Sequence, residues 1–216
     1  MIIKRIFVYL LGLLILAFGV VFAMNSDLGT SPVASVPYVA ALLLPISVGM
    51  LSTAMFLVFI AIQIAILRKQ FKLLDLTQLG FAFVFGFFVD FAVFIMDGLQ
   101  FPGYIGRLLM IIIGIILIAI AISFLITARL PLLPPESLCA AIEKRVSPRW
   151  PRFKFHIVKM CLDSVLVIIA LSVSLIFLGE VAGVREGTVL SAIAIGKIIP
   201  YVRKALAPIF KLLGLG

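Results

Sequence analysis

Charged residues are scarce in this chain, in which Asp, Glu, Lys and Arg make up only 12% of 216 residues. A soluble domain of ordinary composition has about 25% charged residues, so the sequence excludes a soluble globular fold. Apolar residues take their place, at 64% of the chain and a mean hydropathy of +1.34. Because a transmembrane helix needs about 20 apolar residues, we expect an all-α polytopic membrane protein with about six spans.

Cysteine and histidine are also rare, with two cysteines and one histidine. Cys139 and Cys161 form no CxxC pair, so the sequence predicts neither a disulfide framework nor a metal site. The GxxxxGK[ST], HExxH and GxSxG motifs are absent. We therefore expect no enzyme activity, no catalytic residues, no metal and no cofactor. The net charge of +9 does not indicate nucleic-acid binding, because the basic residues lie between the apolar runs.

Six apolar runs predict the membrane spans, near 6–24, 47–67, 75–96, 104–127, 155–178 and 188–206. The first run exceeds the apolar region of a signal peptide, which has about 7–15 residues, so we expect a retained helix. Two further segments, 28–46 and 130–143, are apolar but too short to span and are interrupted by prolines. They predict re-entrant or partial helices, because irregular backbone at membrane depth needs protein or water around it. A helix lying on the membrane surface is the alternative.

Lysine and arginine are distributed unevenly between the loops. Loops on one side carry Lys4, Arg5, Arg68, Lys69, Lys72, Arg129, Lys144, Arg145, Arg149, Arg152, Lys154, Arg203, Lys204 and Lys211. The opposite loops carry Arg107 and Arg185. Because basic loops stay in the cytoplasm, we expect both termini there and an even number of spans.

The first half of the chain recurs weakly in the second half, 102 residues later. The matching residues are Arg5, Gly12, Ala17, Phe22, Leu28, Pro32 and Ser35 with Arg107, Gly114, Ala119, Phe124, Leu130, Pro134 and Ser137. We therefore expect one membrane domain built from two repeats, 1–103 and 104–216. Each repeat would contain three spans and one partial helix. Because three is odd, the repeats must be inverted, as in many solute transporters.

Charged side chains inside the predicted spans are candidates for a solute pathway, because a charge at membrane depth is costly unless paired or hydrated. His156, Lys159 and Asp163 share one face of the fifth span. Asp163 would titrate there, whereas in the alternative Lys159 reaches the headgroups and Asp163 ties helices together. Asp90 lies in the third span and Lys197 in the sixth, and because these two spans occupy equivalent places in the two repeats, we expect the two residues to contact each other. The alternative is that Asp90 forms a structural ion pair and does not line the pathway.

Two predicted helix starts are candidates for binding solute through backbone N–H groups. Gly187 and Thr188 open the last span, and Arg185 adds positive charge, which indicates an anion or carboxylate docking point. Ser31 and Pro32 fit the first turn of the partial helix in the first repeat. Ordinary helix capping is the alternative at both places.

Three stretches carry a resemblance to a known family: RIFVYLLGLLILAFGVVFAMNSDLGTSPV, VKMCLDSVLVI and GVREGTVLSAIAIGK. Their most specific pieces are Leu28-Gly29 before Ser31-Pro32, then Asp163, then Gly187-Thr188. Over nearly its whole length the chain resembles the YczE-like bacterial integral membrane proteins, which are related to the YitT group. The resemblance implies a multi-pass protein of the bacterial inner (plasma) membrane, and it implies neither a substrate nor an enzyme activity.

The sequence favours a small-solute transporter or permease with its site between the inverted repeats. The candidate pathway residues are Asp163, Asp90, Lys197, Lys159, Ser31, Pro32, Gly187, Thr188 and Arg185. The expected partners are the lipid bilayer and an unknown small solute, with proton or sodium coupling and a homo-oligomer left open. The alternative is a non-transporting scaffold or accessory protein that binds a partner through its basic cytoplasmic loop, 143–154.

Overall fold

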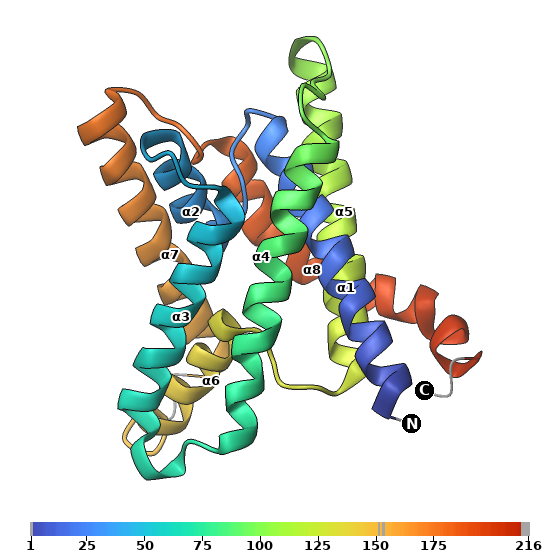
Figure 1. Ribbon diagram of the computed structural model, residues 1–216, viewed down its shortest axis with the longest axis vertical. Coiled ribbons are helices and arrows are strands. Elements are labelled where there is room, and N and C mark those ends of the chain that lie inside the picture. The colour runs from blue at the N-terminus through green and yellow to red at the C-terminus, as the bar shows by residue number, and fades with distance from the viewer. Residues whose placement is uncertain (1, 151, 153, 213–216) are drawn as a thin grey trace.

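The computed structural model describes residues 2–150, 152 and 154–212, which form a helical bundle without strands (Figure 1). Its helices are α1 (Ile2–Asn25), α2 (Pro32–Leu43), α3 (Val48–Leu67), α4 (Thr77–Ile95), α5 (Gly103–Ala128), α6 (Pro134–Val146), α7 (Phe155–Val173) and α8 (Glu186–Leu212). Short helical turns extend three of them: η1 (Arg68–Gln70), η2 (Leu73–Leu76) and η3 (Ser174–Leu178). The all-helical prediction is confirmed for these residues.

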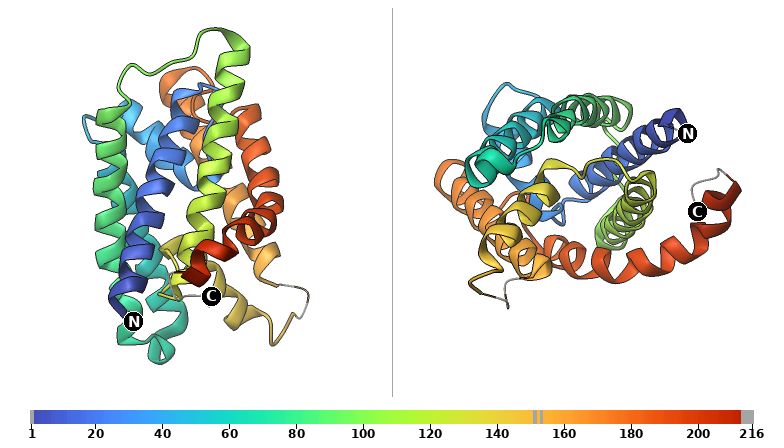
Figure 2. Two further views of the ribbon diagram at one scale, coloured as in Figure 1. Left: turned by 90° about the vertical axis from the view of Figure 1, so that its right-hand side faces the viewer. Right: turned by 90° about the horizontal axis from the view of Figure 1, so that it is seen from below.

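Five helices in the described part of the chain are long and apolar enough to cross a membrane: Ile2–Asn25, Val48–Gln70, Leu74–Ile95, Gly103–Ala128 and Phe155–Leu178. The sixth predicted span, 188–206, lies within α8, which the same criterion leaves out. Lys197, Arg203 and Lys204 interrupt its apolar character. Nevertheless, α8 runs back toward the end of the bundle where α1 begins, and it lies along the side away from α3 and α4 (Figures 1 and 2).

The two segments with prolines form the short helices α2 and α6. Pro32 and Pro134 occupy their first positions, where a helix does not need the missing N–H group. The first turns are buried, whereas Leu42 of α2 and Lys144 of α6 are exposed. Both helices therefore begin inside the bundle rather than lie across its surface, α2 toward one end and α6 toward the other (Figure 1).

Helices α1 and α5 share the most extensive helix–helix interface in the bundle. Early residues of α1 meet late residues of α5: a Cβ added at Gly12 would lie 3.1 Å from Leu125 Cδ2. Further along, a Cβ at Gly19 would lie 3.0 Å from the backbone nitrogen of Ile118. The helices are therefore antiparallel, and the glycines let their backbones approach closely.

Each short helix packs against the other half of the chain, since α2 contacts α7 and α6 contacts α3. Within each half, α4 packs against α1 in the first and α8 packs against α5 in the second. One pair breaks this correspondence: α3 and α4 pack along each other, but α7 and α8 barely touch. The bundle is consequently more open between its last two helices.

Candidate functional site

A cavity of about 570 Å³ lies where the two short helices begin. Ser31–Ala34 and Leu133–Glu136 both contribute residues to its wall, with side chains from all six long helices. Most of these side chains are apolar, among them Phe56 and Phe85. The bundle is thus built around a largely apolar space bordered by the N-terminal ends of α2 and α6.

Three charged side chains line this cavity: Glu136 from α6, and Lys159 and Asp163 from α7. Lys159 Nζ donates a hydrogen bond to Asp163 Oδ1 at 2.6 Å, across one helical turn. Their side chains are only 26% and 20% exposed. The two charged residues that the sequence placed on one helix face therefore form an ion pair inside the bundle.

Among the described residues, Glu136 is the charged side chain of the cavity that forms no close ion pair. It occupies the third position of α6, and its buried Oε2 atom accepts no hydrogen bond from any described residue. Burial raises the pKa of the Glu136 carboxyl above its usual range, while the positive charge of Lys159 acts in the opposite direction. Because an unpaired buried carboxylate is costly, this position favours a proton or a bound cation.

Buried polar side chains hold the chain that leads into α6. Gln63 Nε2 donates to the carbonyl of Pro134 at 3.1 Å, and Gln78 Nε2 donates to Gln63 Oε1 at 3.5 Å. Tyr9 donates its hydroxyl to the carbonyl of Pro131 at 3.0 Å. These contacts from α1, α3 and α4 fix the start of α6, and with it the position of Glu136.

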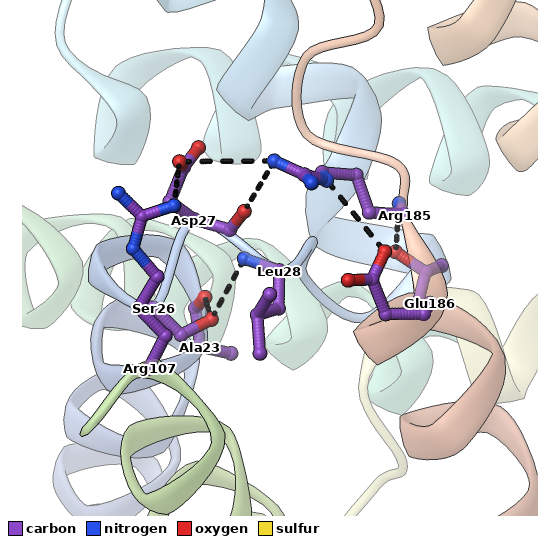
Figure 3. Close-up of polar contacts among 8 residues, drawn as sticks. Ala23, Ser26, Asp27, Leu28, Arg107, Arg185 and Glu186 are labelled. Atoms are coloured by element: carbon purple, nitrogen blue, oxygen red, sulfur yellow. Dashed lines mark hydrogen bonds and ion pairs between the residues drawn. The ribbon is translucent and has the colours of Figure 1, made fainter. Parts of the chain in front are cut away.

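A second polar cluster lies at the end of α1 (Figure 3). Arg107 and Arg185 approach Asp27 from either side (Figure 3), with Asp27 Oδ2 at 2.9 Å and 3.8 Å from their respective Nη1 atoms. Arg185 Nη1 also donates to the Asp27 carbonyl at 3.1 Å, and Arg185 Nε lies 3.6 Å from Glu186 Oε2. The cluster joins the connection between α1 and α2 to the starts of α5 and α8.

The two connections that carry these ion pairs, before α2 and before α8, are also joined by backbone hydrogen bonds. Gly187 N–H donates to the Leu28 carbonyl at 2.7 Å, and Thr30 N–H donates to the Gly183 carbonyl at 3.1 Å. Gly29 lies between them with a φ of +98°. We call residues 27–30 and 183–188, together with Arg107, the loop clamp.

Seven of the nine predicted site residues lie in these two places, with Lys159 and Asp163 in the cavity wall. Ser31 and Pro32 line the cavity, whereas Arg185, Gly187 and Thr188 belong to the loop clamp. Gly187 N–H is bound to Leu28 and Thr188 N–H to the Arg185 carbonyl at 3.0 Å. The prediction that these N–H groups are free to dock an anion is therefore wrong, because the connection between α1 and α2 already uses one of them.

Asp90 and Lys197 are not brought together. Asp90 accepts hydrogen bonds from Gly49 N–H at 2.8 Å and from the hydroxyl of the N-cap residue Ser47 at 2.7 Å, so it supports the first turn of α3. Lys197 is exposed on α8, and no ion pair between it and Asp90 occurs among the described residues. The predicted contact between them is wrong because Asp90 serves its neighbouring helix instead.

Glu136 is the residue that sequence reasoning missed. The charged candidates from the sequence came from the long predicted spans and the helix starts, whereas Glu136 lies in the short helix α6. Its signal was a single carboxylate directly after Pro134 and Pro135 in an otherwise apolar stretch. Such a position is the first turn of a partial helix, where the helix dipole favours a negative charge.

Replacing Asp90 with alanine should lower the free energy of unfolding by about 1–2 kcal/mol, because Gly49 N–H in the first turn of α3 loses its acceptor. Thermal unfolding of the purified protein measures this loss, and Ser47→Ala, which keeps the carboxylate but removes the N-cap hydroxyl that accepts from Met50 N–H, should show a loss of similar size. If a cysteine is introduced into the cavity wall, its rate of labelling by a maleimide should be the same in both variants as in the parent protein. A large change in that rate at unchanged stability would contradict a purely capping role.

Comparison with known proteins gives one match. The model of a family of unknown function, DUF6198, matches residues 3–204, which is nearly the whole chain. No curated protein and no solved structure matches. The resemblance to the YczE-like proteins therefore stays an expectation from the sequence.

Proposed function

We propose that this chain, which belongs to the DUF6198 family of unknown function, is a small-solute transporter that holds its solute in the cavity. The observation that carries the proposal is the convergence of two short helices on one cavity, together with the carboxyl of Glu136, whose buried Oε2 atom has no hydrogen-bond partner among the described residues. Transporter sites are typically built from interrupted helices whose N-terminal ends point at the solute. Non-helical backbone at membrane depth is tolerated where it lines such a cavity.

We also propose that the two halves of the chain are inverted repeats. The starts of α2 and α6 are 102 residues apart, the same offset that relates the sequence matches. A Cβ at Gly12 would meet the Ala121 carbonyl, and a Cβ at Gly114 would meet the Gly19 carbonyl. The offset of 102 turns the first of these contacts into the second. The exchanged packing of α2 on α7 and α6 on α3 supports the same relation.

Transport requires that the cavity open at one end while the other is closed. The loop clamp lies at the end of the bundle opposite to the N-terminus of α1, where it holds two connections of the chain together. The exposed residues of the cavity wall are Ile126, Leu132, Phe155, Ala192 and Gly196, which belong to the last part of α5, the connection before α6, α7 and α8. The cavity in this conformation is therefore proposed to open toward the cytoplasm. The clamp ion pairs are exposed, and such pairs contribute only about 0.2–1 kcal/mol each, so opening the clamp is energetically feasible.

Loosening the clamp should expose the cavity from its closed side. Ser52 lines the cavity and is 5% exposed, so Ser52→Cys reports access after Cys139→Ala and Cys161→Ser remove the native thiols. In this background, Asp27→Asn with Arg185→Ala should weaken the closed state by about 1 kcal/mol. Labelling by a membrane-impermeant maleimide from the extracellular side should become about fivefold faster.

The matched control is Glu180→Gln, which removes a charge from the same connection but leaves the clamp pairs intact. Labelling should then stay at the level of the parent protein. If the double clamp variant also leaves extracellular labelling unchanged, the clamp does not close the cavity and the transporter proposal loses its gate.

The alternative function is a scaffold that docks a partner on the basic loop 143–154. Lys144, Arg145 and Trp150 are exposed, whereas residues 151 and 153 of this loop lie outside the described residues. A scaffold needs no cavity that opens to both sides. The labelling experiment therefore separates the two functions.

A further inference from the structure

The charges that line the cavity indicate what it binds. The titratable side chains in its wall are Tyr9, Glu136, Lys159 and Asp163, so Lys159 is the only cation among the described lining residues. Asp163 holds this cation at 2.6 Å, and Tyr9 donates its hydroxyl to a backbone carbonyl. Neighbouring α3 supplies no titratable side chain. Glu136 and Asp163 therefore share one ammonium group, so the cavity carries one uncompensated negative charge whenever both carboxyls are ionised.

The rest of the wall suits an apolar body. Met55, Phe56, Phe85 and Ile118 line the cavity, and burying apolar surface stabilises a complex by about 25 cal/mol per Å². Few polar groups replace the water that a strongly hydrated solute would lose. One of them, Ser191 Oγ, is buried and has no hydrogen-bond partner in the part of the chain that the structure describes. An occupant therefore needs one positive charge and a mainly apolar surface.

The opening of the cavity suits an occupant that dissolves in the bilayer. Phe155 of α7 and Gly196 of α8 line the cavity and are exposed, and these helices barely touch. A Cβ added at Gly196 would meet no atom within 4 Å. The same helices expose Ile168 and Ile193 on their outer surfaces, as expected for helices in contact with lipid. An apolar solute could therefore enter between α7 and α8.

We infer that the solute is an organic cation with an apolar body, and that it exchanges with a proton on Glu136. The inference rests on the proposed function, because it names the substrate class and coupling ion of the same cavity. When no cation is bound, a proton on the carboxyl removes the buried unpaired charge. When a monovalent cation binds, that proton leaves to water at the open end. Each exchange keeps the charge of the cavity constant.

Two ions of the same shape and opposite charge test this inference. Calorimetry on the protein in lipid nanodiscs, with empty nanodiscs subtracted, should detect saturable binding of tetraphenylphosphonium and none of tetraphenylborate. In buffers of different ionisation enthalpy, binding should release about one proton. Below the pKa of Glu136, the affinity for the cation should fall by about tenfold per pH unit, because the proton competes for the same carboxylate. Equal binding of both ions, or binding independent of pH, would overturn the inference.

Glu136→Gln should weaken tetraphenylphosphonium binding by at least about 30-fold and abolish proton release. This replacement keeps the shape of the side chain and removes a buried charge, so the protein should still fold. Glu136→Asp keeps the carboxylate and should retain proton release. Glu143→Gln changes the same charge two turns along α6, outside the cavity wall, and should leave both unchanged. Unaltered binding in Glu136→Gln overturns the inference.

Failure of the inference is distinguishable from failure of the proposed function. If tetraphenylphosphonium does not bind but loosening the clamp still accelerates labelling of Ser52→Cys, the substrate class is wrong and the transporter proposal stands. If the cation binds at Glu136 but the labelling never changes, the site is right and the transporter proposal fails.

Discussion

Replacing Gly29 with alanine is expected to lower the free energy of unfolding by about 3 kcal/mol and to separate the two parts of the loop clamp. Gly29 has a φ of +98°, a conformation that strains a residue with a side chain. Its new Cβ would also lie 2.5 Å from Thr188 Oγ1 and 2.6 Å from the Arg185 backbone nitrogen. Thr188 is only 2% exposed and has little room to move.

Gly98→Ala separates these two causes. Gly98 also has a positive φ, +69°, but a Cβ there would meet no atom within 4 Å. Gly98→Ala should therefore lower the free energy of unfolding only by the cost of the strained backbone conformation, about 1 kcal/mol. Thermal unfolding of both purified variants gives the comparison. Equal losses would mean that Gly29 does not pack against the start of α8.

Replacing Lys159 with glutamine is expected to cost about 2–3 kcal/mol of stability, because it leaves Asp163 and Glu136 in the cavity without a cation. Breaking a fully buried pair costs about 3–5 kcal/mol, and the partial exposure of Lys159 and Asp163 reduces this figure. The loss should shrink as the pH falls, since protons then neutralise the two carboxylates that the lysine no longer compensates.

A double-mutant cycle identifies the pair. Lys159→Gln with Asp163→Asn should recover at least half of the stability that Lys159→Gln alone loses, because one uncompensated carboxylate is removed. Equilibrium unfolding in detergent measures all four proteins. Strictly additive losses would show that the two side chains do not interact in the folded protein.

Local features of the fold could be predicted from the sequence because short-range rules determine them. Long apolar runs gave the long helices, and Pro32 and Pro134 indicated the starts of α2 and α6. The pair of Lys159 and Asp163 follows from helix geometry, which brings residues four apart together. Helix α8 is long enough to be a span, but its charged residues lower its apolar character, so its length alone does not identify it as one.

Contacts between distant segments could not be predicted in the same way. The equivalent places of their helices in the repeats predict a contact between Asp90 and Lys197, but the start of α3 binds the Asp90 carboxylate instead. Glu136 approaches Lys159 only because α6 enters the bundle beside α7. Likewise, Gly29 needs to be glycine because Thr188 of a distant segment packs on it. Each of these depends on how the whole bundle packs.

The measurement that tests the central claim most directly is a pair of spin-label distances in lipid nanodiscs. One pair, Tyr104→Cys with Val181→Cys, reports the clamp end, and the other, Arg129→Cys with His156→Cys, reports the opposite end. In the Cys139→Ala and Cys161→Ser background, weakening the clamp with Asp27→Asn and Arg185→Ala should lengthen the first distance and shorten the second. Distances that stay unchanged at both ends would contradict a cavity that opens alternately to the two sides.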